Sequence, residues 1–336
     1  MEKVYLHVLP GQQFHFGGYS SYETNVLEEC DTHIHSDLLF SALVDLCSQV
    51  YPDFVESLIS GFKKGEIRIS SAFWFMQEGD TEICFYPKPS SCNLFRSTNF
   101  KKYKKVKYVS ERIIEQGITP EKWNEECFME GTFLVTEEEL NKIGIKSMPR
   151  LYDSVTSQKV RVHTDTVEDN LFLQTNIQVN DPGYPEISTG FWFYLDTPST
   201  ESKSNNVIMS LIRILADRGI GGQRSTGTGK IYKVSKHDSM DLKIIPGEPV
   251  LTLGLLSPDE SETDNLLYYS LLTRGGRYSA SGQRLRLLNM LEEGAILIGP
   301  TEGNIINLKP ENKTPALRYG KSLNISINKK FIPKWS

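Results

Sequence analysis

The sequence predicts an α+β fold of antiparallel sheets with helices on one face. The first observation is the element order over residues 1–240, which is strand, helix, strand, a long insertion, then strand, helix, strand. This is the split βαβ order of a ferredoxin-like domain. The second is a glycine-rich loop between the last helix and the last strand. The third is a Pro/Gly cluster near residue 246, after which a shorter β-rich unit begins.

The first domain opens with a strand over 4–9, which Pro10 and Gly11 end. Apolar residues at helical spacing predict a helix over 37–50, with Ser36 as its N-cap. A strand is predicted over 66–76 because the segment is rich in β-branched and aromatic residues. An insertion over about 85–185 follows, rich in Pro, Lys and Tyr, with a short exposed helix over 136–140.

The second half of the first domain repeats the pattern. An aromatic strand over 189–195 precedes a helix over 205–217, and the strand 230–234 follows the glycine-rich loop. The second domain, 245–336, begins with a strand over 250–256. A helix over 264–273 and further strands are predicted after it; these strands lie at 284–290, 295–298 and 322–327.

Composition is that of an ordinary soluble protein, with 39% hydrophobic and 24% charged residues among 336. No apolar run is long enough to span a bilayer, so we expect no membrane partner. The five cysteines form no Cys-x-x-Cys pair, which predicts reduced thiols in the cytoplasm. The formal net charge of −5 argues against a general polyanion binder but permits a local basic groove. No His/Cys/Asp/Glu spacing indicates a metal site, and we expect no cofactor.

The glycine-rich loop, residues 218–230, is the main candidate site. Five of the eleven residues from 219 to 229 are glycine, which favours a concave backbone able to hold phosphate oxygens. Arg224 adds a guanidinium that can grip a phosphate or stack on a base. The candidate RNA-binding residues are Arg218, Gly219, Gly221, Gly222, Gln223, Arg224, Ser225, Thr226, Gly227, Gly229 and Lys230.

Simpler interpretations of this loop remain open. Gly219 can cap the preceding helix ahead of a plain turn, and Arg218 can simply complement the helix dipole. Two nucleotide-binding motifs do not fit. The loop runs from helix to strand, and Ile231 follows Lys230 where a phosphate-binding P-loop needs Ser or Thr. The dinucleotide fingerprint also requires the opposite order.

A lysine-rich segment within the insertion is the second candidate RNA contact. Lys101, Lys102, Lys104 and Lys105 are interleaved with aromatic residues, a pattern that suits an RNA backbone with bases stacked alongside. The alternative is a solvated turn without a partner.

Two histidines and two arginines complete the candidates. His33 and His35 precede the first helix and could serve as acid and base of an endoribonuclease, or contact RNA or a partner. Arg274 and Arg277 could extend an RNA groove or cap a turn.

Several segments also match one family. The loop 219–229 resembles the glycine-rich loop of the RAMP superfamily of CRISPR proteins. Residues 35–43 are similar to the opening helix of one of its families, the fourth subunit of the type III-A Csm effector complex. The segments 291–294 and 318–321 resemble that family's C-terminal part.

The resemblance implies two ferredoxin-like (RRM-like) domains and a non-cleaving RNA-binding subunit of a prokaryotic antiviral ribonucleoprotein. The implied RNA is the 5′ tag of the guide (crRNA). The implied protein partners are the large palm-domain cyclase subunit and the backbone RAMP subunit. An inserted β-hairpin that kinks the crRNA is expected within 85–185. The alternative is a repeat-RNA-processing endoribonuclease that uses His33 or His35, with no metal.

Overall fold

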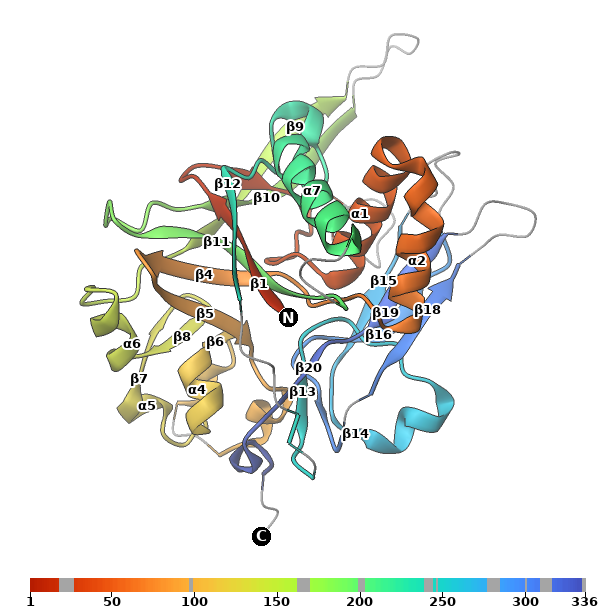
Figure 1. The fold of residues 1–336 in the computed structure, drawn as a ribbon. Helices are drawn as coiled ribbons and strands as arrows, with labels where there is room; N and C mark the ends of the chain where they lie inside the picture. The colour runs from red at the N-terminus through yellow and green to blue at the C-terminus, as the bar shows by residue number, and fades with distance from the viewer. Residues whose placement is uncertain are drawn as a thin grey trace.

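The computed structural model describes residues 1–17, 27–96, 99–161, 170–198, 203–238, 244–245, 247–276, 285–299, 301–308 and 316–333. Its largest element is a nine-stranded sheet with the strand order β12-β1-β11-β4-β5-β6-β8-β7, to which β3 adds by pairing with β11 (Figure 1). The first four of these strands are β12 (Lys233–Asp238), β1 (Glu2–Val8), β11 (Ser188–Asp196) and β4 (Phe73–Glu78).

These four strands form the split βαβ arrangement that the sequence predicts. Helix α1 (Ser36–Val50) connects β1 to β4, and β11 lies between those two strands. Helix α7 (Lys203–Arg218) connects β11 to β12, and β1 lies between them. All three strand pairs are antiparallel. The α+β class with antiparallel sheets is therefore confirmed.

The helices α1 and α7 pack against each other beside the sheet, with α2 (Val55–Lys64) next to α1 (Figure 1). The apolar stripe predicted for α1 is buried, including Leu39, Leu43 and Leu46. In α7, Ile208, Leu211 and Leu215 face the same core.

The first part of the insertion adds strands to the nine-stranded sheet, and its last part forms a separate hairpin. Its strands in the sheet are β5 (Thr81–Pro87), β6 (Tyr108–Ser110), β7 (Cys127–Glu130) and β8 (Phe133–Thr136). Its short helices are η2 (Ser90–Leu94), α3 (Phe100–Tyr103), α4 (Glu111–Gln116), α5 (Trp123–Glu126) and α6 (Glu137–Lys142). Helix α6 confirms the short helix predicted near 136–140, although Glu139 and Leu140 are buried rather than exposed, and Thr136 caps it in a capping box with Glu139.

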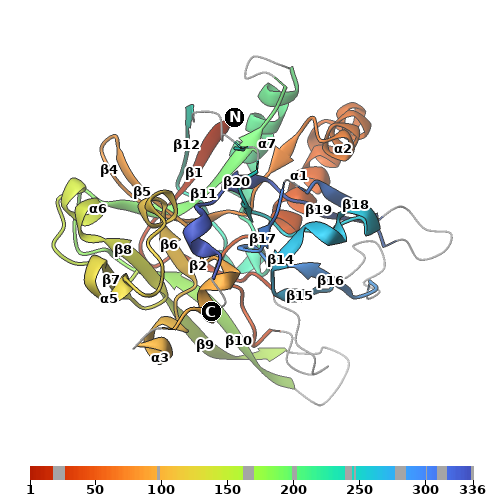
Figure 2. The ribbon, with the colours of Figure 1, turned by 90° about the horizontal axis from the view of Figure 1, so that it is seen from below.

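A long hairpin ends the insertion. Strands β9 (Tyr152–Arg161) and β10 (Asn170–Val179) pair antiparallel, and β2 (Gln13–Phe14) adds to β10 at the base of the hairpin. The hairpin extends away from the rest of the molecule (Figure 2). A hairpin thus lies within the predicted insertion, although its role stays a prediction.

The second unit is β-rich, as predicted. Its four-stranded sheet has the order β14 (Leu266–Tyr268), β17 (Ile296–Leu297), β13 (Val250–Thr252) and β20 (Asn324–Ser326). Two hairpins accompany it, β15 (Leu271–Arg274) with β16 (Leu288–Leu291), and β18 (Gly303–Asn307) with β19 (Leu317–Lys321).

The helix predicted over 264–273 is wrong. The chain forms the 3₁₀ turn η4 (Glu260–Asn265) and then the strands β14 and β15, because β17 and β16 offer strand partners there. A second short turn, η5 (Lys329–Phe331), is the last element. The described residues after 247 contain no α-helix, so a ferredoxin-like assignment of this unit stays a prediction, as does the boundary near 245.

Three details of the first domain also differ from expectation. The strand predicted over 66–76 is divided into β3 (Arg68–Ile69) and β4, because the backbone N–H of Ser71 donates to Leu253 of the second unit. Ser36 is the first residue of α1 rather than its cap, and its hydroxyl accepts from the N–H of Leu255. The strand after the glycine-rich loop begins at Lys233.

None of the helices within the described ranges is long and apolar enough to cross a membrane. All five cysteines are free thiols. A short turn, η1 (Pro52–Phe54), joins α1 to α2.

Candidate nucleic-acid interface

The glycine-rich loop leaves the end of α7 and returns to the sheet at β12, with the turn η3 (Arg224–Thr226) at its centre. Its backbone is left-handed at Gly219, Gly221, Gly227 and Gly229, where φ lies between 83° and 96°. Gln223 is also left-handed, with φ of 59°, and is the only non-glycine residue with positive φ among those the structure describes. Such a conformation in a residue with a Cβ is uncommon and is frequent at ligand-binding sites.

Close backbone contacts explain why three of these positions are glycine. A Cβ at Gly221 would lie 2.6 Å from the carbonyl oxygen of His15, and one at Gly229 would lie 2.3 Å from that of Ile220. At Gly219 it would lie 3.1 Å from the carbonyl of Thr228. These glycines therefore pack the loop against itself and against the segment around β2.

Hydrogen bonds from the loop amides hold it in place. The N–H of Gly222 donates to His15 O (2.8 Å), and that of Gly229 donates to Gln13 O (2.7 Å). Gly219 caps α7 by donating to Leu215 O. The cap expected at Gly219 is thus present, but a well-bonded loop follows it rather than a plain turn.

Only part of the loop is left to hold a ligand. The backbone N–H groups of Gly221, Gln223, Arg224 and Ser225 have no acceptor among the described residues. These four residues line a hollow of about 590 Å³ together with Gly222 and Arg218. The amides available to phosphate are therefore those of the four residues that line this hollow.

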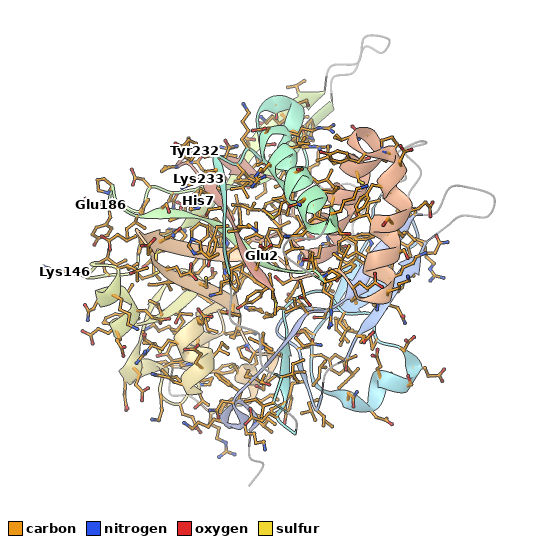
Figure 3. The ribbon with its side chains drawn as sticks, in the orientation of Figure 1. Glu2, His7, Lys146, Glu186, Tyr232 and Lys233 are labelled. Carbon is orange, nitrogen blue, oxygen red and sulfur yellow. The ribbon has the colours of Figure 1, made fainter. Side chains whose placement is uncertain are left out.

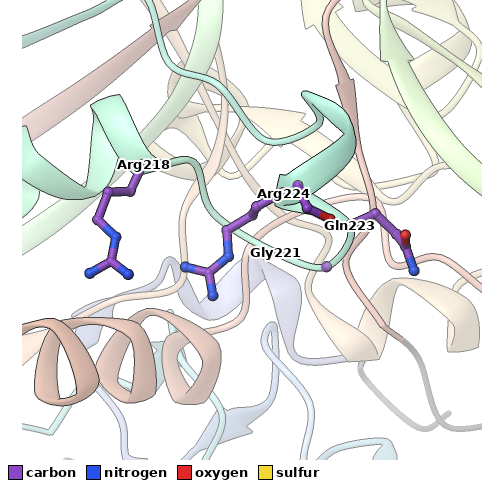
Figure 4. Close-up of a pocket in the computed structure, with 6 residues that line it drawn as sticks. Arg218, Gly221, Gln223 and Arg224 are labelled. Carbon is purple, nitrogen blue, oxygen red and sulfur yellow. The ribbon is translucent and has the colours of Figure 1, made fainter.

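Two guanidinium groups reach this hollow. Figure 4 shows the side chains of Arg218 and Arg224 extending side by side, while Gln223 points the other way. Arg218 donates to the Gln49 side chain at the end of α1 (2.8 Å). Arg224 is exposed and has no ion-pair partner among the described residues. Lys230, Ser225, Thr226 and Gly227 are exposed as well.

The lysine-rich segment lies elsewhere. Lys101, Lys102, Lys104 and Lys105 are exposed around α3, and none of them lines the loop's hollow. The tyrosines among them do not offer faces to bases, because Tyr103 packs edge-on against Trp123 and Tyr108 stacks on Phe133. Phe100, 43% exposed, is the aromatic residue left for stacking.

The two candidate histidines are largely buried in a polar cluster. The side chains of His33 and His35 are 12% and 3% exposed. Both ring nitrogens of His35 face carboxylates, Nδ1 that of Glu293 (2.8 Å) and Nε2 that of Asp31 (3.2 Å). Burial alone would lower the pKa of His35, but these carboxylates outweigh burial and raise the pKa to about 10. Burial, together with the neighbouring His35, lowers the pKa of His33.

Arg274 belongs to the same cluster. It is 7% exposed and forms a bidentate pair with Asp37 at the start of α1, with both distances 3.0 Å. It also donates to Asp31 (3.1 Å), and Arg318 contacts Asp37 from β19. Arg274 is thus an internal ion-pair partner, which neither sequence interpretation anticipated. Arg277 lies outside the described residues.

Sequence reasoning missed Asp31, Asp37, Glu293 and Arg318 as members of this cluster. Glu293 is 258 residues from His35 along the chain, so no local spacing connects them. The only signal was the family resemblance of the segments 291–294 and 318–321, which contain Glu293 and Arg318.

A further hollow lies at one end of β1 and β12, where His7, Tyr232 and Lys233 come together (Figure 3). It measures about 560 Å³, and the sequence did not indicate it. Tyr232 is 70% exposed beside Lys233.

Comparison with known proteins supplies the remaining observation. Residues 246–327 match the family of the CRISPR Csm4 C-terminal domain. The curated CRISPR system Cms protein Csm4 of Methanocaldococcus jannaschii is 24% identical, over 93% of this chain and 90% of that protein. The chain is similar to Csm4 along nearly its whole length. The resemblance to this RAMP subunit predicted from the sequence is therefore confirmed.

Solved structures that contain Csm4 have the same fold. A chain in the crystal structure of the Csm3-Csm4 subcomplex of the type III-A CRISPR-Cas interference complex matches with a TM-score of 0.70 and 21% identity. The match covers 98% of this chain and 100% of that one. A chain in the Csm1-Csm4 cassette in complex with cA4 matches with a TM-score of 0.58 and 18% identity over the whole of both. Because these sequence identities are low, the structural matches establish only the fold of this chain.

Proposed function

We propose that this chain is a non-catalytic RNA-binding subunit of a type III-A CRISPR effector complex in a prokaryotic cytoplasm. In this proposal the loop 218–230 holds the sugar–phosphate backbone of the crRNA 5′ tag. The observation that carries the proposal is the hollow at the front of that loop, where unpaired amides lie beside Arg218 and Arg224.

The similarity to Csm4 supports the proposed partners. The matched relatives occur in structures with Csm3 and with Csm1. We therefore propose that this chain contacts a Csm3-type backbone subunit and a Csm1-type large subunit. The hairpin β9–β10 is the proposed thumb that kinks the guide, because it is the long hairpin within the insertion.

Replacing Arg224 tests the loop's role. We expect Arg224→Ala to weaken crRNA retention in the reconstituted complex by about tenfold, because an ionic contact to phosphate is lost. The plot of log affinity against log salt should become shallower by about one unit. Filter binding with labelled crRNA between 50 and 300 mM salt measures both quantities.

The matched control is Arg213→Ala, which removes the same charge from an exposed position of α7 outside the hollow. Retention and salt dependence should match the unmodified chain. Equal behaviour of the two variants would mean that the loop packs against protein only, contrary to the proposal.

The lysine-rich segment is tested by charge reversal. We expect Lys101, Lys102, Lys104 and Lys105 changed together to Glu to lower crRNA affinity by at least tenfold, since four favourable phosphate interactions become repulsive. The control reverses four exposed lysines elsewhere, namely Lys63, Lys64, Lys329 and Lys330. Similar affinities for both quadruple variants would leave the segment a solvated turn.

The nuclease alternative is not favoured by the geometry. A general base needs a nitrogen within reach of the ribose 2′-hydroxyl. Both nitrogens of His35 are paired with carboxylates, whereas Nδ1 of His33 lies 3.0 Å from the Tyr108 hydroxyl and its Nε2 is buried. We expect repeat RNA incubated with the purified chain to stay intact. Cleavage that disappears in His35→Ala would overturn the non-catalytic assignment.

A further inference from the structure

Three side chains from two distant parts of the chain converge beneath a cavity of about 290 Å³. His33 and His35 lie just before α1, and Glu293 lies in the turn between β16 and β17. One donor atom from each lies within 4.8 Å of the other two. Two imidazole nitrogens and a carboxylate are a donor set that borderline divalent metals such as Zn²⁺ prefer.

Two atoms of this group lack partners. Nε2 of His33 and Oε2 of Glu293 are buried without a hydrogen bond among the described residues. Nε2 of His33 lies 3.5 Å from Oε1 of Glu293, but the two do not form a hydrogen bond. Buried polar atoms without a partner carry a desolvation cost. A cation between the two side chains would satisfy both atoms.

In each of the two histidines, the ring nitrogen that does not face Glu293 already has a partner. Nδ1 of His33 lies 3.0 Å from the Tyr108 hydroxyl, and Nε2 of His35 lies 3.2 Å from Asp31. Nε2 of His33 and Nδ1 of His35 are the nitrogens nearest Glu293, and an ion between them would replace the 2.8 Å hydrogen bond between His35 Nδ1 and Oε1 of Glu293. Metal-binding histidines show this pattern, in which the second nitrogen donates to a carboxylate or another oxygen that fixes the ring.

The group lies within a network of opposite charges. Three carboxylates, those of Asp31, Asp37 and Glu293, face two guanidinium groups, those of Arg274 and Arg318. Glu292 and the lysines Lys88, Lys104 and Lys107 also line the cavity, so the charge balance alone does not select an ion. A neutral imidazole is the form that binds metal.

We propose that His33, His35 and Glu293 bind one divalent transition-metal ion of the zinc class. Three protein ligands leave a fourth position, which faces the cavity between the insertion and the second unit. The bound ion would join the segment before α1 to the β16–β17 turn, so it would connect the two units of the molecule. This inference does not depend on RNA binding.

The test uses the full-length chain after treatment with a chelator. Zinc is titrated in competition with a chromophoric chelator, and cobalt is added separately to record its visible absorption. We expect about one equivalent of zinc and the absorption bands of four- or five-coordinate cobalt. Zinc should also raise the melting temperature of the chain.

Variants then locate the ion. His33→Ala and Glu293→Gln should lower zinc affinity by at least 100-fold. Tyr108→Phe should lower it by about 10- to 100-fold, because it removes only the outer partner of His33. The control is His237→Ala, which removes a half-exposed histidine on β12.

Two outcomes would overturn the proposal. One is the absence of stoichiometric zinc and of the cobalt bands in the unmodified chain. The other is binding that His33→Ala, Glu293→Gln and Tyr108→Phe leave unchanged, which would place the ion elsewhere. If either buried substitution prevents folding, the cobalt spectrum of the unmodified chain and the Tyr108→Phe affinity decide the question.

Discussion

Gly227 and Gly229 share a left-handed backbone but have different surroundings. Gly227 has φ of 87° and no neighbouring atom within 4 Å of an added Cβ. Gly229 has φ of 84°, and its added Cβ would lie 2.3 Å from the carbonyl oxygen of Ile220. A substitution at Gly227 therefore tests backbone strain alone. A substitution at Gly229 also forces the new Cβ against a backbone carbonyl.

We expect Gly227→Ala to lower the free energy of unfolding by about 1–2 kcal/mol, the cost of placing a Cβ in that conformation. Gly229→Ala should cost about 3 kcal/mol or more, since the carbonyl of Ile220 must also move. Urea denaturation of the full-length variants measures the difference. Equal losses would show that the loop adjusts freely at Gly229.

At the residue scale, the sequence indicated the loop but not the use of each glycine. A cluster of glycines predicts close approach of backbone, and it does not say to what. Gly219, Gly221 and Gly229 approach other parts of the protein, so fewer residues of the loop are open to a ligand than the glycine pattern implied. The role of Arg224, which has no ion-pair partner among the described residues, stays a prediction.

At the scale of elements, the sequence pattern predicted helix α1 but not the ion pairs at its first turn. The apolar stripe over 37–50 predicted the helix because burial follows a 3.6-residue period. The burial of Asp37 had no local signal, since its partners Arg274 and Arg318 are more than 230 residues away. The mistaken helix at 264–273 has the same origin, because strand partners distant in sequence decide that segment.

We expect Asp37→Asn to destabilise the chain by about 3–5 kcal/mol, because two buried guanidinium groups lose their shared carboxylate. Asp45→Asn on the exposed side of the same helix should change stability by less than about 0.5 kcal/mol. Thermal unfolding followed by circular dichroism measures both. A small effect at Asp37 would mean that water reaches Arg274 and Arg318.

At the scale of the whole molecule, the two units share the main apolar core, and a smaller separate cluster lies within the second unit. Tyr319 of β19 stacks on Phe40 of α1 and packs edge-on against Phe62 of α2. Leu251, Ile296 and Ile325 of the second unit join the same cluster as the central sheet. The Pro/Gly cluster near 246 therefore marks a change of sheet and not a gap in packing.

We expect the chain to unfold in one cooperative transition, because described residues of both units pack together in the main apolar core. Differential scanning calorimetry should give a calorimetric enthalpy equal to the van't Hoff enthalpy. Tyr319→Ala should lower the single melting temperature without dividing the peak. Two resolved peaks would instead identify the units as independent domains.

The short strand β2 has a mechanical consequence. On one side it pairs with β10 at the base of the long hairpin, with Phe14 opposite Ile177. The carbonyls of Gln13 and His15 accept the amides of Gly229 and Gly222, while the His15 ring bonds to Thr175 of β10. Through these contacts β2 connects the base of the hairpin to the glycine-rich loop, so a force applied to the hairpin would be transmitted to the loop.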